Sequence, residues 1–383
     1  MEPSELEHYR AVNSIVERDS TFATYKYALL RGTIEICREY PHLKREEGSR
    51  VYFPLGLLIE KWLLSYYPIF STDRFIPQQG GEKEHTSRQI SFRRAFQPVI
   101  DFYRDIGGYS QWYSDYQRGR IPKQIQREFI DLCKKVRSTI ITMPMDHLGY
   151  SQYGKPYSVL DYPRKRLTLP KNANPDRDFL INQFGEFYFV RKEIFEVFTL
   201  FGGYLTGETT VLRKWAELTH RLDETVGIGD MISLLSLYPV EERNVQAAEN
   251  FCAYLGRRNI PVTCAWSGRS LTGKEMHLDH LLPFSICRNN DLWNLMPAFG
   301  PFNEQKSNRI PSGDLLERQK GAILTYWTLM SEFDPDTFFR ELRISLTGTM
   351  STDENWQEHA FDRLMDRCRF MTGMLGYEEW DGP

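Results

Sequence analysis

The chain lacks paired cysteines, an uninterrupted apolar run and a strong net charge. Its six cysteines are scattered without any Cys-x-x-Cys pair, which argues against a disulfide framework and against a four-cysteine zinc site. The most apolar stretch, residues 51–70, contains two prolines together with Glu60 and Lys61, so it is too interrupted to span a bilayer. With 48 Lys and Arg against 51 Asp and Glu, the formal charge of −3 excludes a basic coat over the whole surface but allows a local basic patch.

The remaining composition is typical of a folded protein that is not embedded in a membrane. Hydrophobic residues make up 41% and charged residues 26% of the 383 residues, and aromatic residues at 14% supply ample core material. At roughly 150 residues per domain, this length predicts about two to three domains. Residues 1–10 are polar and acidic, unlike a secretory signal, and scattered cysteines suit a reducing compartment, so we expect a cytoplasmic protein.

Apolar residues recur at helical spacing over most of the chain. We expect a helical N-terminal domain over residues 1–248, with an irregular connector near 150–190. Residues 249–312 are rich in Gly, Asn, Pro and His and predict a small mixed module, whereas residues 313–383 return to a helical pattern as a C-terminal cover. The expected fold class is therefore mainly α, with a small α+β module inserted between helical segments. The expected helices cover residues 20–40, 54–67, 122–141, 192–222, 314–333, 334–346 and 355–375, and the strand-like runs are 166–169 and 186–190.

Residues 264–311 combine several polar features in one short segment. In chain order these are the pair Asp279-His280 with a proline three residues on, then Asn294, then Asn303 and Lys306. The last two are three residues apart and so share one helix face. Upstream, the turn residues of the run SGRSLTG (267–273) predict a hairpin that places strand 262–266 beside strand 275–280.

These residue types suit the cleavage of a phosphodiester, which needs an activated water and neutralisation of developing charge. The Asp279 carboxylate and the Asn303 side-chain carbonyl are oxygen ligands of the kind that Mg²⁺ prefers. An unligated His280, with a pKa near ~6.5, can take a proton from water at neutral pH. Neighbouring residues of a strand face opposite ways, so Asp279 and His280 serve one site only if the strand ends there. Asn294 is then a candidate to hold the His280 backbone, and Lys306 to bind phosphate.

The order of these features resembles the HNH (ββα-metal) nuclease motif, over about residues 257–312 only. The most similar variant is the zinc-free one of type II CRISPR effectors and of several phage and restriction nucleases. The resemblance implies that Asp279 and Asn303 bind one Mg²⁺ or Mn²⁺ ion and that His280 is the general base. It further implies that Asn294 steadies the histidine loop and that cleavage leaves a 5′-phosphate and a 3′-hydroxyl.

The segment departs from many HNH sequences, which carry two Cys-x-x-Cys pairs around a structural zinc. Here the corresponding positions read Cys264-Ala265-Trp266 and Pro297-Ala298-Phe299. We therefore expect Trp266 and Phe299 to replace the metal by packing, with no structural zinc. His277 lies two residues before Asp279 and therefore on the same face of the strand. It is a candidate extra metal ligand or phosphate contact, and the alternative is a surface histidine of the hairpin.

Local charge is compatible with a phosphate track. Between residues 257 and 309 there are seven bases and four acids, so the segment carries 7 − 4 = +3, and Arg309 joins Lys306 as a candidate phosphate contact. Basic residues of the expected helix at 123–137 and the run at 164–166 are further candidates for DNA contact. A solvated surface is the favoured explanation of both.

The expected function is that of a metal-dependent HNH endonuclease acting on DNA. The segments TYKYALLRGTIEIC (24–37) and VYFPLGLLIEKW (51–62) resemble uncharacterised prokaryotic HNH proteins, some from phage defence or restriction. Two alternatives stay open: an inactive or partner-gated DNA-binding subunit of a larger complex, and an RNA-cutting nuclease. The expected partners are DNA and a protein from a defence operon, with no membrane; one ββα site cuts one strand, so a double-strand break needs a homodimer or two events.

Overall fold

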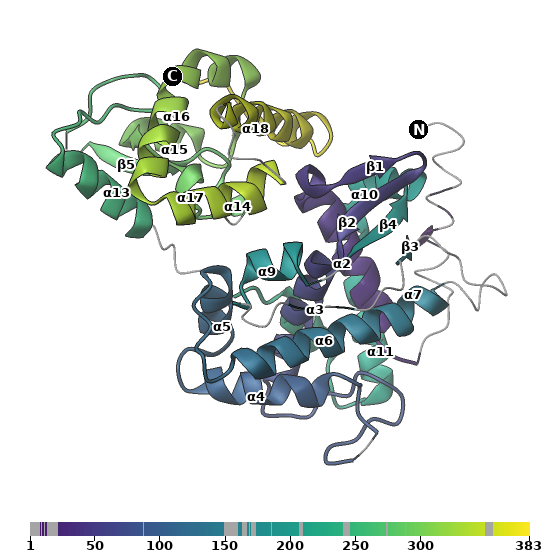
Figure 1. Cartoon of the computed structure of the whole chain (residues 1–383). Coiled ribbons are helices and arrows are strands. Elements are labelled where there is room, and N and C mark those ends of the chain that lie inside the picture. The colour runs from purple at the N-terminus through teal and green to yellow at the C-terminus, as the bar shows by residue number, and fades with distance from the viewer. Residues whose placement is uncertain are drawn as a thin grey trace. The chain divides into compact units, whose positions relative to one another are not determined.

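The computed structural model describes residues 8, 10, 12–13, 22–86, 88–148, 160–162, 167, 169, 174–184, 186–206, 210–239, 246–272, 275–287, 289–348 and 355–383. The chain divides into unit 1, Met1–Glu241, and unit 2, Glu242–Pro383, which are described separately (Figure 1). The expected module at 249–312 and the expected cover at 313–383 both lie in unit 2. About half of the expected connector at 150–190, residues 166 and 168 of its strand-like run, and the basic run at 164–166 lie outside the described residues.

Unit 1 is built from helices and one small sheet. Its described helices are α2 (Tyr25–Glu39), η1 (Pro41–Leu43), α3 (Leu55–Phe70), α4 (Arg93–Arg104), α5 (Gly108–Gln117), α6 (Gln126–Thr142), α7 (Pro144–His147), α9 (Arg177–Asn182), α10 (Lys192–Leu205), α11 (Val211–Leu222) and α12 (Ile228–Ser236). The sequence predicted the helices α2, α3, α6, α10 and α11 to within a few residues at each end. The span expected to be helical over 192–222 contains two helices, α10 and α11.

Helix α3 is the central element of unit 1. Every residue of α3 except Leu64 is buried, as expected for a helix that is apolar on all sides. Its aromatic rings contact those of other helices: Trp62 stacks on Tyr25 of α2 at 5.8 Å between centroids, and Tyr66 lies 5.1 Å from Trp215 of α11. The apolar stretch that was too interrupted to span a bilayer is thus a buried core helix.

The two charges within α3 are both paired. Glu60 accepts hydrogen bonds from Arg177 at 2.9 Å and from the Tyr116 hydroxyl at 2.8 Å. Lys61 forms ion pairs with Glu39 at 2.6 Å and with a second glutamate of α2. Burying a charge is tolerable only when such partners replace its water shell.

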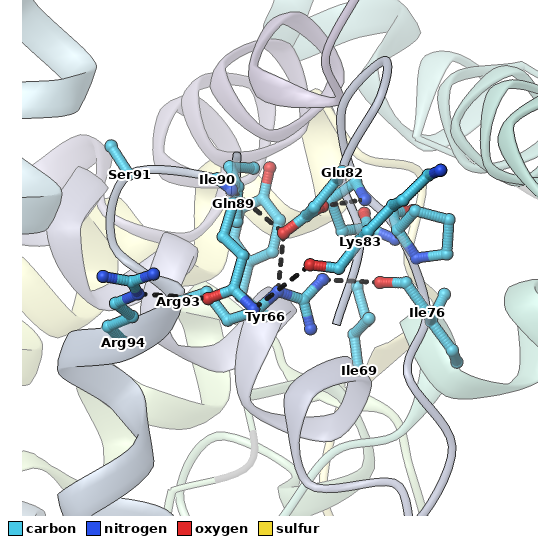
Figure 2. Close-up of polar contacts among 12 residues, drawn as sticks. Tyr66, Ile69, Ile76, Glu82, Lys83, Gln89, Ile90, Ser91, Arg93 and Arg94 are labelled. Atoms are coloured by element: carbon cyan, nitrogen blue, oxygen red, sulfur yellow. Dashed lines mark hydrogen bonds and ion pairs between the residues drawn. The ribbon is translucent and has the colours of Figure 1, made fainter. Parts of the chain in front are cut away.

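A buried carboxylate also holds the long connection between α3 and α4, which the sequence predicted to be a loop. Glu82 accepts hydrogen bonds from the backbone N–H of Gln78 at 2.5 Å and of Ile90 at 2.9 Å, and its third partner is Arg93 at 2.7 Å (Figure 2). One side chain therefore closes the loop onto the start of α4. Both oxygens of the Glu82 carboxylate accept hydrogen bonds, so this residue has a structural role.

A four-stranded antiparallel sheet flanks the helices of unit 1. Its strands are β1 (Arg45–Glu47), β2 (Arg50–Pro54), β3 (Leu160–Asp161) and β4 (Phe187–Arg191), in the order β1-β2-β4-β3. Strand β4 confirms the strand-like run at 186–190. On the inner face, Val51, Phe53, Tyr188 and Val190 are fully buried.

Unit 2 combines the short strands of the module with three long helices. Its elements are α13 (Gln246–Arg257), β5 (Met276–His280), α14 (Phe284–Cys287), η2 (Leu292–Asn294), β6 (Leu295–Phe299), α15 (Gly300–Lys306), β7 (Ile310–Pro311), α16 (Gly313–Phe333), α17 (Pro335–Leu342), the π-helical turn η3 (Arg343–Thr347), α18 (Trp356–Gly373) and β8 (Glu379–Trp380). Asp334 caps α17 by accepting a hydrogen bond from the N–H of Thr337 at 3.2 Å, with Pro335 at the first helical position, near the start of the helix expected at 334–346.

One hydrophobic core joins the module to the C-terminal helices. Trp293, beside β6, packs edge-on against Trp327 of α16 at 6.4 Å between centroids, and the Trp327 indole N–H donates to the Trp293 carbonyl at 2.8 Å. The two segments expected as separate parts thus form one packed unit. The fold class is confirmed as mainly α with a small α+β module. No helix among the described ranges combines the length and the apolar character needed to cross a bilayer.

The closest approach of two elements in unit 1 generates a prediction about stability. A Cβ atom added at Gly56 of α3 would lie 1.8 Å from the Leu180 carbonyl oxygen of α9, and backbone cannot move aside as a flexible side chain does. Overpacking of a core typically costs about 1–3 kcal/mol, and Gly56→Ala should lower the free energy of unfolding by at least that amount. Urea unfolding measures this change. In the control Gly229→Ala, on α12, the added Cβ has no neighbour within 4 Å, so stability should stay the same or rise. Equal stability of the two variants would contradict this account of the α3–α9 contact.

Candidate active site

The polar segment of the module folds as two strands and a helix. Strands β5 and β6 are antiparallel, with Asp279 opposite Met296 and His280 opposite Leu295. Helix α15 begins directly after β6 and carries Asn303 and Lys306. Strand β5 ends at His280. The regular alternation of side chains therefore stops there, as one shared site for Asp279 and His280 requires.

The predicted pairing of strand 262–266 with strand 275–280 is wrong. The turn residues close a smaller hairpin, in which Thr263 bridges Ser270 and the Leu271 N–H donates to the Val262 carbonyl at 2.8 Å. The hairpin lies beside β6, because the N–H of Ala265 donates to the carbonyl of residue 297 at 2.9 Å. A hairpin signal identifies a turn, but it does not reveal which later strand completes the sheet.

Asp279 is the best-enclosed acid of the site. Its side chain is buried, with 3% of the residue exposed. One carboxylate oxygen, Oδ2, accepts a hydrogen bond from the Trp266 indole Nε1 at 2.6 Å, and the other, Oδ1, lies 3.2 Å from the Lys306 ammonium. Both oxygens of this carboxylate therefore have a defined orientation.

Lys306 is completely buried at the end of α15, where the sequence predicted a phosphate contact. Its ammonium donates to Asp279 and to the His280 carbonyl at 2.5 Å, and it lies 5.5 Å from the Trp266 ring centroid. Burial lowers the pKa of Lys306, and the neighbouring Asp279 carboxylate opposes that change. In this structure Lys306 thus neutralises the acid and ties down the end of β5, with its ammonium turned away from solvent.

His280 is half-buried and lies near a residue that the sequence reasoning missed. Its Nε2 is 3.0 Å from the Asn290 side-chain oxygen, and its ring lies 5.6 Å from that of Phe284. With the amide oxygen as acceptor, Nε2 carries the proton and Nδ1 carries the lone pair that a general base requires. Asn290 gave no sequence signal of its own, because asparagines are common in loops.

Asn294 is fully buried and ties the chain that follows His280. Its side-chain oxygen accepts from the Leu282 N–H at 2.8 Å, and its amide nitrogen donates to the carbonyls of Leu282 at 3.1 Å and of Asn289 at 3.0 Å. The sequence expected a bond to the His280 backbone itself, whereas the bonds fall two residues later. Asn294 therefore shapes the turn after the histidine.

The remaining predicted residues lie nearer the surface. Asn303 is half-buried on the same face of α15 as Lys306, and its side chain makes no hydrogen bond to the described residues. His277 is exposed, and its ring packs over Gly300, with Nε2 2.9 Å from where a Cβ would stand. Arg309 is half-buried, and its guanidinium donates to the Gln305 carbonyl.

Asp279 and Asn303 carry oxygen donors of the kind that a hard cation binds. Oδ1 of Asp279 faces the Lys306 ammonium, and Asn303 lies three residues before Lys306 on the same face of α15. Within the described part of the chain, no three His, Cys, Asp or Glu side chains gather as a ligand set. One carboxylate and one amide oxygen agree with a Mg²⁺ ion that keeps most of its waters and gains a phosphate oxygen from the substrate.

Two features near the hairpin concern the expected absence of zinc. Trp266 is buried and packs edge-on against Trp380 of β8 at 5.4 Å between centroids. The Cys264 thiol accepts a hydrogen bond from the Phe299 N–H at 3.3 Å. Trp266 thus packs as expected, and its bond to Asp279 is an additional role that a packing argument could not foresee.

Two half-buried carboxylates, Asp291 and Glu341, support the loop that carries Asn290. The Asp291 carboxylate accepts hydrogen bonds from Ser345 at 2.5 Å and from Asn289 at 2.7 Å. The next backbone N–H, that of Leu292, donates to Glu341 of α17 at 2.7 Å. Burial and the nearby Asp291 carboxylate raise the pKa of Glu341 to about 8. The C-terminal helices therefore fix the loop that lies against His280.

Comparison with known families identifies the class of this site. Residues 264–312 match the profile of the HNH endonuclease family, which supports nuclease activity in general. Residues 5–235 match the domain of unknown function DUF8808. That match covers more than half of the chain, so the protein belongs to the DUF8808 family. Comparison with curated proteins and with solved structures finds no match.

The raised pKa of Glu341 predicts how stability depends on pH. In the unfolded chain this carboxyl ionises near pH ~4.3, whereas in the folded protein it ionises near pH 8. The free energy of unfolding should therefore fall as pH rises from about 4.3 to about 8, and Glu341→Gln should flatten that fall in urea unfolding. The exposed Glu332→Gln on α16 is the control and should follow the wild type. A Glu341→Gln curve parallel to that of the wild type would rule out the shift.

Proposed function

We propose that this protein is a metal-dependent HNH endonuclease that hydrolyses DNA phosphodiester bonds with one Mg²⁺ or Mn²⁺ ion. The observation that carries the proposal is the ββα arrangement within the segment that matches the HNH family: Asp279 and His280 end β5, and α15, which carries Asn303, directly follows β6. Asp279 and Asn303 would hold the ion there. When bound, the ion would supply positive charge for the phosphate and for the leaving oxygen.

In this proposal His280 takes a proton from the attacking water. Asn290 orients the imidazole through Nε2, and Nδ1 carries the lone pair that receives the proton. Asn294 preserves the turn that follows, and Lys306 keeps the Asp279 carboxylate in place. His277 and Arg309, nearer the surface, are the proposed contacts for phosphate, with His277 as the candidate extra ligand.

The finer assignments rest on the resemblance and on local chemistry. We propose a zinc-free module, because Trp266 packs where other sequences have a cysteine pair and Cys264 is hydrogen-bonded to backbone. We also propose a role in prokaryotic phage defence or restriction, in the cytoplasm. A homodimer, or two successive events, would cut both strands.

A partner-gated form is the second candidate, and the placement of Lys306 favours it. The ammonium occupies the Asp279 oxygen that a cation would take, so the site as it stands holds a positive charge already. Binding of a defence-operon partner or of the substrate would then free that oxygen. An inactive DNA-binding subunit and an RNA-cutting nuclease are the other outcomes of the tests below.

The role of general base proposed for His280 predicts a large loss of activity when this side chain is removed. His280→Ala should slow the nicking of a supercoiled plasmid in Mg²⁺ or Mn²⁺ by about 10²–10⁴-fold while leaving the fold intact. The control is His359→Ala, an exposed histidine of α18 in the same unit, which should retain wild-type rates. A parallel assay with an RNA substrate distinguishes a DNA-cutting from an RNA-cutting nuclease. Wild-type protein that cuts neither substrate, with and without neighbouring-operon proteins, would refute the proposal.

The bond between Trp266 and Asp279 predicts a change in metal affinity. Trp266→Phe keeps a ring against Trp380 but removes the N–H that orients the carboxylate, so Mn²⁺ should bind about 10- to 100-fold more weakly. Calorimetry without nucleic acid measures this directly. The matched control is Trp380→Phe, because its buried N–H has no hydrogen-bond partner within the described ranges and its loss should leave Mn²⁺ affinity unchanged. Equal Mn²⁺ affinities of the two variants would contradict a role for Trp266 in positioning the metal ligand Asp279.

A further inference from the structure

The small sheet of unit 1 has two faces of different chemistry. Residues directly opposite each other in an antiparallel pair share a face, and successive residues alternate between faces. The register pairs Arg45 with Tyr52, Tyr52 with Phe189, and Arg50 with Arg191. These residues therefore lie together on the outer face, away from the buried residues of β2 and β4.

Aromatic rings and guanidinium groups alternate on that outer face. Tyr52, Phe187 and Phe189 are partly exposed. The Arg45 guanidinium lies over the Phe187 ring at 4.1 Å from its centroid, and the Arg50 guanidinium lies over the Phe189 ring at 4.4 Å. The rings of Tyr52 and Phe189 are 5.8 Å apart. The result is a row of flat groups across three neighbouring strands.

The outer face carries a small excess of positive charge, which favours an anionic ligand. The alternation places Arg45, Arg50 and Arg191 on this face together with Glu47, and Asp161 is opposite Phe189 in the register, so three bases and two acids give 3 − 2 = +1 in a chain of −3. Glu46, whose register partner is the inner-face residue Val51, is paired with Lys44 and Lys192, at 2.6 and 3.5 Å.

We propose that this outer face binds single-stranded nucleic acid. An unpaired base would stack on the Tyr52 ring, and further bases would stack on the Phe187 and Phe189 rings once Arg45 and Arg50, which lie over them, turn to contact the phosphates. A duplex is a poorer ligand, because its base faces are already stacked within the helix and only its edges and backbone are accessible. The proposal goes beyond the nuclease function and does not depend on it, since no residue of unit 2 takes part.

The test is fluorescence anisotropy of the full chain with a labelled oligothymidine of about 16 nucleotides, in EDTA so that no cleavage occurs. Phe189→Leu keeps an apolar side chain but removes a stacking surface, so the affinity should fall by about 5- to 150-fold. The control is Tyr204→Ala, a 59% exposed aromatic of α10 outside the sheet, which should bind as the wild type does.

The arginines give a second readout that does not depend on core packing. Replacing Arg45 and Arg50 together by Gln should reduce the slope of log affinity against log salt by about 1.4, or about 0.7 for each phosphate contact on a single strand. The control for charge is Arg213→Gln, an exposed arginine of α11. An unlabelled duplex of the same length should compete poorly.

Three results would overturn the inference. The first is wild-type protein that does not bind the oligothymidine. The second is binding that Phe189→Leu and the double arginine variant leave unchanged, which would place the ligand elsewhere. The third is equal competition by the duplex. A face that binds a protein segment and not nucleic acid would give this first result, because the oligothymidine would then not bind. Plasmid nicking by the same variants is measured separately, so failure of the nuclease proposal leaves this test intact.

Discussion

The burial of Asp279 is the constraint on which the site depends. A carboxylate removed from water is stable only if each of its oxygens finds a partner, and here the partners are the Trp266 indole and the Lys306 ammonium. They come from the hairpin before β5 and from the end of α15, so one side chain joins all three parts of the module. Because Lys306 also holds the His280 carbonyl, the acid and the histidine are positioned together.

The C-terminal helices belong to the same arrangement. They share the core of the module, and Glu341 and Ser345 hold the loop that carries Asn290. Unit 1 uses buried charges differently, since Glu60 and Glu82 bind arginines and backbone groups of its own helices and loops. Those contacts stabilise a scaffold, whereas the outer face of its sheet presents aromatic rings paired with arginines.

Local signals in the sequence identified much of this structure. The cap at Asp334 and the apolar helix α3 were predictable, because each depends on residues close together in the chain. The acid, the histidine and the two asparagines of the module were likewise visible as a spaced pattern. The strand partner of 275–280 was not, since a hairpin turn constrains only its own two arms, and β6 lies 15 residues past the end of β5.

Residue type and spacing by themselves indicated an HNH-like segment, which the family match over residues 264–312 supports. The tertiary structure alone decided what each group contacts. Lys306 reads as a phosphate contact in sequence, yet folding buries its ammonium on Asp279. Trp266 reads as packing, yet its N–H orients the acid, and Asn290 carried no signal at all until it lay beside His280. The physical reason is that a side chain's charge and hydrogen-bonding capacity are local properties, whereas its partners are set by which distant segments the core brings together.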